Sequence, residues 1–388
     1  MLFDRFSLES VAAPAGKERD AAFDRALAEL VERREEFREQ GYVPRDFVHL
    51  LKEAGIYRSA TPATFGGDPE PPAEFMRRLE RISEVDPSTG WVAAFGSALT
   101  YLTALPRETQ QQMYAKGLDI VFAGGFYPLC RAQRVDGGWV ATGTWTFASG
   151  CMGADIIGLG LDGGPEAEGK PLVAMVPPQD VEFIQDWDVT GMRASGSFGV
   201  KAEDLFIPDE MTFLRGAAAT VDEPVTRYPV MGYAAQVHAA TALGAARAAL
   251  DLMIEAGSSA QPGKPSRGDR ADFQLALAHA EAELRSARAL FYETTEQTWE
   301  KAVRNEEIPL EDAGLLRVAA THAAQTGASV AQQAFRMAGT SAIFATHPLQ
   351  QLLQDAVVPA QHAALQENTL ENAGAVLMGM KPALPAFP

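Results

Sequence analysis

Two groups of residues in this 388-residue chain have types and spacing that suit chemistry. The first is Trp145, Phe147 and Ser149 in the segment WTFASG. On a strand, rings two residues apart project to one face, where they can pack on a flat ligand beside the serine hydroxyl. The second is His362, because an imidazole with an ordinary pKa of about 6.5 exchanges protons near neutrality. The sequence therefore predicts a site for a planar ligand and a group that handles a proton.

Each group also has a purely structural interpretation. An aromatic pair with a serine behind it can fill the core of a β-domain, and a histidine on a C-terminal helix is usually structural.

Few other chemical centres are present in the sequence. Cys130 and Cys151 lack a second cysteine or a histidine at zinc-ligand spacing, so both are interpreted as small buried hydrophobic residues and no metal site is predicted. The sequence contains no G-x-G-x-x-G that follows a strand, no G-x-x-x-x-G-K-[ST] and no H-E-x-x-H. Rossmann, P-loop and zincin chemistries are excluded.

The first part of the chain predicts helices. Residues 21–38 have the pattern of a charged amphipathic helix. Pro44 suits the first turn of a second helix, and Gly55 suits the left-handed position after its end. Two further helices are predicted over 75–85 and 90–105, after a turn rich in glycine and proline.

Short apolar runs separated by glycines then predict an antiparallel sheet, for example at Trp139-Val140-Ala141 and Ile156-Ile157-Gly158-Leu159. The helical period returns after Tyr228, where four long helices predict a bundle. Residues 258–270, rich in Pro, Gly, Ser and Arg, are expected to be a mobile loop between its first two helices. The predicted domains are N-terminal helices over 1–118, a β-domain over 119–210 and the C-terminal bundle over 211–388.

Charge and hydropathy limit the partners. The 33 basic and 51 acidic residues give a net charge of −18, which repels the phosphate backbone that a nucleic-acid binder must neutralise. No run approaches the roughly 18 apolar residues of a membrane span, and residues 1–8 lack a signal-peptide core. We expect a cytoplasmic protein without a nucleic-acid or membrane partner.

The order of helices, small β-domain and four-helix bundle resembles the acyl-CoA dehydrogenase fold across nearly the whole chain. Pro44 to Gly55 and Phe65-Gly66-Gly67 resemble its N-terminal signature. Trp187 to Pro208 (WDVTGMRASGSFGVKAEDLFIP) resembles the strand pair that closes its β-domain. The resemblance implies a mainly α-helical fold with a central β-domain.

Within that superfamily, WTFASG resembles the W-x-F-x-S-G strand of flavin-dependent monooxygenases, a branch that includes phenol, indole and dibenzothiophene oxygenases. The resemblance implies that Trp145 and Phe147 pack on the isoalloxazine, that Ser149 forms a hydrogen bond near flavin N5, and that Pro128 also contacts the cofactor. Such a site would protect a C4a-hydroperoxide from water.

The C-terminal segment FRMAGTSAIF, followed by HPLQ, Asp355 and His362, resembles that branch's C-terminal signature. The resemblance implies that His362 acts as acid or base on the substrate or the hydroperoxide. It also implies that backbone N–H groups and hydroxyls meet the flavin phosphate of a neighbouring subunit, from Gly339, Thr340 and Ser341. A helix break with a small-residue turn is the structural alternative. The dehydrogenases' glutamine before paired glycines is not reproduced, since Phe335 and Ala338 occupy those places.

A dehydrogenase needs a carboxylate that removes an α-proton from a thioester. Ala363 stands at the usual glutamate position, and residues 231–242 contain no acid. Glu367, about one helical turn further on, is the remaining candidate. An FAD-dependent acyl-CoA dehydrogenase therefore stays as an alternative, and a non-catalytic helical assembly protein is the alternative from another class.

The substrate is expected to be aromatic. Phenol-hydroxylating relatives often carry a histidine on the helix after the Gly-Trp pair, but residues 90–101 contain none, and this favours an indolic or other fused-ring substrate. The candidate substrate contacts, which as helix residues can also be plain core, are Phe95, Tyr101, Tyr233 and Gln236.

These inferences predict the oxygenase component of a two-component monooxygenase. It would use reduced flavin, FMNH₂ or FADH₂, and O₂ to hydroxylate or epoxidise an indolic or phenolic substrate. Because no nicotinamide site is found, a separate NAD(P)H-dependent flavin reductase would supply the reduced flavin. A homotetramer is expected, since the family builds flavin sites across subunit interfaces.

Overall fold

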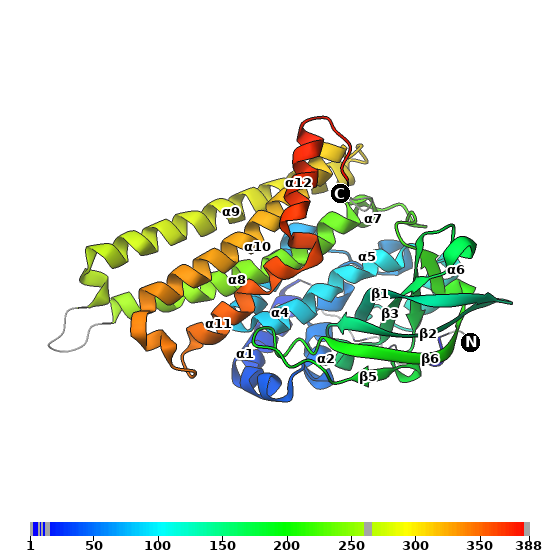
Figure 1. Cartoon of the computed structure of the whole chain (residues 1–388), viewed down its shortest axis with the longest axis horizontal. Coiled ribbons are helices and arrows are strands. Elements are labelled where there is room, and N and C mark those ends of the chain that lie inside the picture. The colour runs from blue at the N-terminus through cyan, green and yellow to red at the C-terminus, as the bar shows by residue number, and fades with distance from the viewer. Residues whose placement is uncertain (1–2, 7, 9–10, 12–15, 260–265, 384–388) are drawn as a thin grey trace. The chain divides into compact units, whose positions relative to one another are not determined.

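The computed structural model describes residues 3–6, 8, 11, 16–259 and 266–383 (Figure 1). The chain divides into two compact units, which we call the sheet unit and the bundle unit. The sheet unit contains the residues up to Glu70, Val92–Val189 and Arg193–Arg227. The bundle unit contains Pro71–Trp91, Thr190–Met192 and the residues from Tyr228 onward.

Helices α1 and α2 form where the sequence predicts them, whereas the helix predicted over 90–105 is interrupted by a 3₁₀ segment at Ala94–Ala98. Helix α1 packs on helix α2 through Phe37 and Phe47, whose rings lie 5.0 Å apart and are both inaccessible to solvent. Gly55, just after α2, has a φ of 75°, the left-handed conformation predicted for it. The helices of this unit are α1 (Lys17–Gln40), α2 (Arg45–Glu53), α5 (Leu99–Leu102), α6 (Arg107–Tyr114) and α7 (Pro224–Arg227), and α4 (Pro87–Ala93) crosses its boundary.

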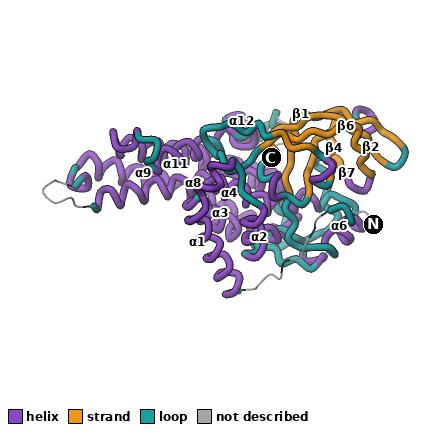
Figure 2. The backbone as a smooth tube through the Cα atoms, turned by 90° about the horizontal axis from the view of Figure 1, so that it is seen from below, coloured by secondary structure: helices purple, strands orange, loops and turns teal. Residues whose placement is uncertain are grey.

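The described strands form one sheet in the order β5-β6-β2-β1-β3-β4-β7 (orange in Figure 2). Inside it, the glycine-rich strands allow close approach: a Cβ on Gly160 would lie 2.1 Å from the carbonyl oxygen of Phe126. The strands are β1 (Phe122–Val135), β2 (Gly138–Ala148), β3 (Ile156–Asp162), β4 (Pro171–Val176), β5 (Glu182–Ile184), β6 (Phe198–Pro208) and β7 (Thr212–Leu214).

The sheet is mixed, whereas the sequence predicted an antiparallel one. Strands β1 and β3 pair in parallel, with Phe122 opposite Ile156 and Gly125 opposite Leu159. Strand β2 runs antiparallel to β1 and returns the chain to the beginning of β1. Because β3 starts at that same end and lies on the other edge of β1, it must run in the direction of β1.

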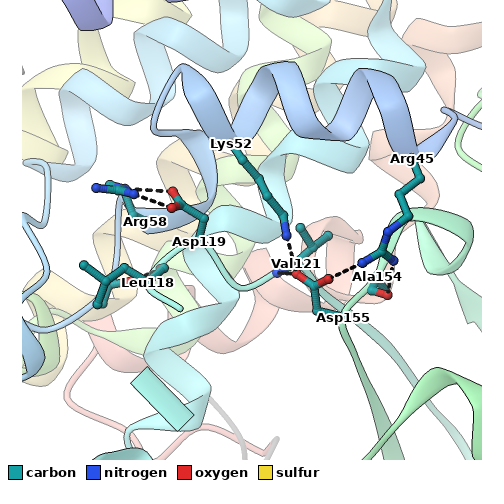
Figure 3. Close-up of polar contacts among 9 residues, drawn as sticks. Arg45, Lys52, Arg58, Leu118, Asp119, Val121, Ala154 and Asp155 are labelled. Atoms are coloured by element: carbon teal, nitrogen blue, oxygen red, sulfur yellow. Dashed lines mark hydrogen bonds and ion pairs between the residues drawn. The ribbon is translucent and has the colours of Figure 1, made fainter. Parts of the chain in front are cut away.

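A buried carboxylate ties helix α2 to the start of the sheet (Figure 3). Asp155, which is fully buried, accepts hydrogen bonds from Lys52 Nζ and from Arg45 Nη2, both at 2.7 Å. Its Oδ2 also accepts from the backbone N–H of Val121 at 3.0 Å. A second buried acid, Asp119, pairs with Arg58. The two acids fix the entry into β1 and β3 relative to the helical layer.

The bundle unit contains the predicted C-terminal helices together with α3. Helices α8, α9 and α10 have 29, 33 and 29 residues, while the fourth helix of the bundle, α11, has 10. Leu284 and Phe291 lie seven residues apart on α9, and both are buried. The helices are α3 (Pro72–Val85), α8 (Val230–Ser258), α9 (Ala271–Val303), α10 (Leu310–Ala338), α11 (Pro348–Val357) and α12 (Glu367–Leu377).

Helix α8 is the centre of this unit. A Cβ on Gly244 would lie 2.5 Å from the carbonyl oxygen of Glu80, and one on Gly327 would lie 2.6 Å from that of Ala242, so small residues let α3 and α10 approach α8 closely. In the part of the chain that the structure describes, α8 alone is long and apolar enough to cross a membrane. Its apolar window is 72% buried inside the protein, as in the core helix of a soluble protein.

Part of the loop predicted over 258–270 has a defined conformation. Residues 260–265 of that prediction lie outside the described residues. Ser266 begins a short 3₁₀ turn, in which its hydroxyl accepts from the N–H of Gly268 while Asp269 accepts from the N–H of Ser266. This capping box gives the second half of the segment a defined conformation.

Candidate active site

Ser149 lies directly after β2, in a row of three buried hydroxyls. Its Oγ is 2.6 Å from Ser197 Oγ, which is 2.7 Å from Ser195 Oγ. Gly150 turns the chain with a φ of 74°, and its N–H donates to the carbonyl oxygen of Ser195 at 2.8 Å. Hydroxyls both donate and accept, so the row can hold Ser149 in a fixed orientation. Ser195 and Ser197 were not predicted from the sequence, although their two-residue spacing was a possible signal.

The rings of Trp145 and Phe147 differ in their environments, which corrects the expectation that both project to one face of a regular strand. Trp145 is fully buried, and its Nε1–H donates to the carbonyl oxygen of Gly160 at 2.7 Å. Phe147 is 64% exposed and has a φ of 63°. The pairing of β2 with β6 shifts register between Trp145 and Ala148, so the alternation of a regular strand is interrupted there.

Phe147 instead has a different aromatic neighbour. The ring of Trp187 lies 6.0 Å from it, at 87° in an edge-to-face arrangement. Pro128, the other expected cofactor contact in this unit, is exposed on β1. The end of β2 therefore presents an accessible ring beside a row of hydroxyls, while Trp145 supports the strand from inside.

The expected substrate contacts are divided between the units. Phe95 and Tyr101 are partly buried in the sheet unit, where Tyr101 lies 6.3 Å from the ring of Phe126. Tyr233 and Gln236 belong to the bundle unit and are almost completely buried.

Gln236 is used within the bundle rather than presented to a ligand. Its Oε1 accepts from the hydroxyl of Tyr228 at 2.8 Å, and its Nε2 donates to Thr295 Oγ1 at 2.6 Å. Tyr233 packs edge-to-face on Phe75 and Tyr228. The polar contact to a substrate that the sequence suggested at Gln236 is thus already occupied in this conformation.

His362 belongs to an aromatic cluster with Trp91 and His238. The rings of Trp91 and His238 stack 4.1 Å apart with an interplanar angle of 23°. The ring of His362 lies 4.8 Å from that of His238 and 5.7 Å from that of Trp91. His238 was not predicted from the sequence; its signal was an imidazole in the first half of α8, which carries no charged residue.

The cluster is electrically neutral at physiological pH. Burial, and then the charge of Arg317, lower the pKa of His362 to about 4. Burial, and then the neighbouring His362, hold the pKa of His238 well below its ordinary value. The N–H of Ala364 donates to His362 Nδ1 at 3.3 Å, so the proton of the neutral ring resides on Nε2. His362 is consequently a hydrogen-bond donor at Nε2 and a weak base.

The turn Gly339-Thr340-Ser341 follows the end of α10 and is flanked by an arginine. Gly339 has a φ of 60°, and both Gly339 and Thr340 are exposed. Arg267 donates from Nη1 to the carbonyl oxygen of Ala338 at 2.7 Å and from Nη2 to Ser341 Oγ at 3.2 Å. An exposed turn beside a guanidinium suits an anionic group such as a phosphate. Arg267 was not predicted from the sequence as a site residue.

These residues fit a flavin in the chemistry of their groups. An isoalloxazine needs aromatic surface and hydrogen-bonding groups at its polar edge, which Phe147, Trp187 and Ser149 offer. A flavin phosphate needs donors and positive charge, which the Gly339–Ser341 turn and Arg267 offer. The first set belongs to the sheet unit, and the second set belongs to the bundle unit together with His362.

Comparison with known proteins places this chain in a family. Residues 17–118 match the acyl-CoA dehydrogenase N-terminal domain, and residues 236–367 match the acyl-CoA dehydrogenase C-terminal domain. The solved structure of 3-HSA hydroxylase from Rhodococcus sp. RHA1 is similar at a TM-score of 0.87 and 24% identity, covering 96% of this chain and 99% of that one. That of TdsC from Paenibacillus sp. A11-2 with FMN and indole has a TM-score of 0.81 at 16% identity, covering 95% and 99%.

These structural similarities show the fold. The sequence comparison reaches further, because this chain is 40% identical over 357 residues to an indole-3-acetate monooxygenase from Pseudomonas putida, covering 91% of each sequence. This chain therefore belongs to the flavin-dependent monooxygenases of the acyl-CoA dehydrogenase superfamily.

Proposed function

We propose that this chain is the oxygenase component of a two-component monooxygenase, and that it hydroxylates or epoxidises an aromatic substrate of the indole-3-acetate class. The observation that carries the proposal is the 40% identity to the Pseudomonas putida indole-3-acetate monooxygenase across 91% of both sequences. When bound, reduced flavin supplies the two electrons with which one atom of O₂ enters the substrate and the other leaves as water.

The residues after β2 would hold the ring system of the cofactor. Phe147, which is exposed, and Trp187, which is partly buried, offer aromatic surface. Ser149 offers a hydroxyl whose orientation is set by Ser197. Pro128 on β1 is a further candidate contact. Trp145 acts indirectly, because its buried indole fixes the strand that carries Phe147 and Ser149.

His362 would act as a neutral hydrogen-bond donor. With its proton on Nε2 and a pKa of about 4, the ring is a poor acceptor of a substrate proton at pH 7. Its Nε2–H can instead stabilise an oxygen atom that gains negative charge during the reaction. This proposal keeps His362 as a catalytic residue and replaces general-base chemistry with hydrogen-bond donation.

The residues around His362 favour this activity over dehydrogenation. Ala363 carries no carboxylate, and residues 363–365 form a 3₁₀ turn. Glu367 begins helix α12 and is exposed, so it does not lie one turn above Ala363 on a continuous helix. The chain thus offers no buried carboxylate in this segment to take an α-proton from a thioester.

The proposal also covers the binding of the flavin phosphate, the source of the reduced flavin and the assembly of the chains. The Gly339–Ser341 turn would contact the phosphate of FMN or FAD bound to a neighbouring subunit, assisted by Arg267. A separate NAD(P)H-dependent reductase would deliver the reduced flavin. Next to that turn, Ile343 and Phe344 are each 64% exposed, which supports a covering neighbour in a homotetramer. We also propose that the enzyme acts in the cytoplasm.

The test is transfer of ¹⁸O from ¹⁸O₂ to indole-3-acetate, with chemically reduced FMN or FAD and measured by mass spectrometry. Ser149→Ala should lower labelled product per reduced flavin by about 10-fold or more and increase hydrogen peroxide, because a hydrogen bond to a developing charge contributes roughly 1.5 to 3 kcal/mol.

Ser286→Ala is the control, since this exposed serine on α9 bonds only its own helix backbone in the described contacts. It should retain the wild-type yield. Absence of labelled product from the wild type, with reduction of a bound oxidised flavin by acyl-CoA, would show a dehydrogenase instead.

A further inference from the structure

The orientation of His362 depends on the short turn that follows it. The N–H of Leu365 donates to the carbonyl oxygen of His362 at 2.8 Å, and the N–H of Ala364 donates to His362 Nδ1 at 3.3 Å. Of these contacts, the second decides which ring nitrogen carries the proton. A change in the position of Ala364 would therefore release Nδ1 and permit the other tautomer.

A buried arginine holds this same residue from the neighbouring helix. Arg317 on α10 is 4% exposed, and its Nη2 donates to the carbonyl oxygen of Ala364 at 3.0 Å. The hydroxyl of Thr369, on the first turn of α12, also donates to that oxygen at 3.3 Å and lies 3.5 Å from the guanidinium. Ala364 is thus held at its carbonyl oxygen by Arg317 on α10. Its N–H, on the other side, contacts the imidazole of His362.

The ring of His362 is confined on another side by the Trp91–His238 stack. Because His238 is neutral and flat, it limits rotation of the imidazole without adding a charge. The Trp91–His238 stack on α4 and α8 therefore limits the position of the His362 ring. Arg317 on α10 acts on its tautomer, through Ala364.

Among the described residues of α8, α10, α11 and α12, the acidic, basic and histidine side chains that are buried are His238, Arg317 and Asp355. Asp355 accepts from the N–H of Met192 and from Gln351 Nε2, both of which lie away from the His362 turn in sequence. Arg317 is the group whose charge lowers the pKa of His362, after burial. The same guanidinium thus acts on the imidazole both through the turn and through its charge.

We propose that Arg317 is a positioning residue for His362: it anchors the Ala363–Leu365 turn so that the imidazole is held as the neutral tautomer with its proton on Nε2. The catalytic consequence rests on the hydrogen-bond donation proposed above for His362. The position of the proton itself can be tested without flavin or substrate.

The experiment is long-range ¹H–¹⁵N NMR of the full chain labelled with ¹⁵N-histidine, titrated from pH 8 to pH 4, with His362→Gln assigning the signal. The wild type should show the Nε2–H tautomer and titrate near the lower end of this range. Arg317→Met should mix the tautomers and raise the midpoint by about one pH unit or more, since a nearby like charge is removed. Arg317→Lys keeps the charge and loses the planar fork, so it should mix the tautomers at a low midpoint.

Arg247→Met is the matched control, because Arg247 is another arginine of the bundle and bonds Glu281 and Asp251 instead. It should leave the His362 signals unchanged. The proposal is overturned if folded Arg317→Met keeps the wild-type tautomer and midpoint, or if Arg247→Met reproduces its effect. If Arg317→Met does not fold, an unchanged tautomer in Arg317→Lys overturns the proposal equally. A negative ¹⁸O₂ result bears on the proposed function and leaves this NMR result standing.

Discussion

Two neutral imidazoles in contact, His238 and His362, make the stability of the protein sensitive to acid. Below the ordinary histidine pKa of about 6.5 the unfolded chain takes up a proton at each ring. The folded chain does not protonate His362 until about pH 4, and His238 also has its pKa well below the ordinary value. Unfolding therefore binds protons between these values, and the free energy of unfolding falls as the pH falls from about 6.5 to 4.

Urea unfolding at pH 7.5, 6 and 5 checks this prediction, with His238→Phe as the comparison because phenylalanine keeps a ring against Trp91. The loss of stability between pH 7.5 and 5 should be smaller in the variant. Glu80 contributes the opposite slope in both proteins, since burial raises the pKa of its carboxyl. Equal losses in the two proteins would contradict the assignment to His238.

Asp155 is a second residue whose charge matters locally. Asp155→Asn would leave Lys52, which is 5% exposed, without its carboxylate. Removing one partner of a buried pair costs about 3 to 5 kcal/mol, whereas exposed pairs contribute about 0 to 1 kcal/mol. The control is Asp209→Asn, whose partner Arg134 is exposed. Urea unfolding should show a larger loss in the free energy of unfolding for Asp155→Asn than for Asp209→Asn. Similar losses in both variants would refute this prediction.

At the scale of elements, the contacts of α8 depend on small residues. A Cβ on Gly244 would lie 2.5 Å from a backbone oxygen of α3, which cannot move as a flexible side chain could. Gly244→Ala should therefore destabilise the bundle unit by about 1 to 3 kcal/mol, as overpacking does.

Gly374→Ala on α12 is the matched helix substitution, because a Cβ there would meet nothing within 4 Å. It should be neutral or stabilise by about 0.5 to 1 kcal/mol, since alanine favours a helix. Thermal unfolding, monitored by circular dichroism, distinguishes the stabilities of Gly244→Ala and Gly374→Ala. A Gly244→Ala variant as stable as wild type would show that α3 and α8 can separate without cost.

At the scale of the whole molecule, the apolar surface near the end of α10 indicates that copies of this chain associate. Ile343 and Phe344 are exposed apolar side chains beside the Gly339–Ser341 turn. For the proposed homotetramer, light scattering should give the mass of four chains for the wild type and a smaller mass for Phe344→Glu, because a buried unpaired charge is strongly unfavourable. Each chain also has a net charge of −18, so added salt should favour assembly by screening repulsion.

Val31→Glu provides the control for this prediction, since Val31 is also apolar and 50% exposed but lies on α1 of the sheet unit. It should leave the mass unchanged. A wild-type protein of one chain, or a Phe344→Glu variant that keeps the mass of four chains, would be inconsistent with a tetramer built through this surface.

Local patterns in the sequence were enough to predict the fold class. Hydrophobic periodicity gave the helices, turn residues such as Gly55 gave their ends, and the glycine-punctuated runs gave the strands. The WTFASG and FRMAGTSAIF segments indicated the monooxygenase branch to which the chain belongs. These features are local in sequence, so neighbouring residues suffice to specify them. The domain boundaries at 118 and 210 and the roles of the site residues stay predictions.

The environment of each side chain was decided by tertiary structure. A register shift separates buried Trp145 from exposed Phe147, although they are two residues apart. Packing of distant segments brings His238 to His362 and Arg317 to the turn after it. By itself, the sequence determined which elements form and to which family the chain belongs. Only the fold decided which side chains are buried, paired or neutral, because burial and pKa depend on groups that are distant in the chain and close in space.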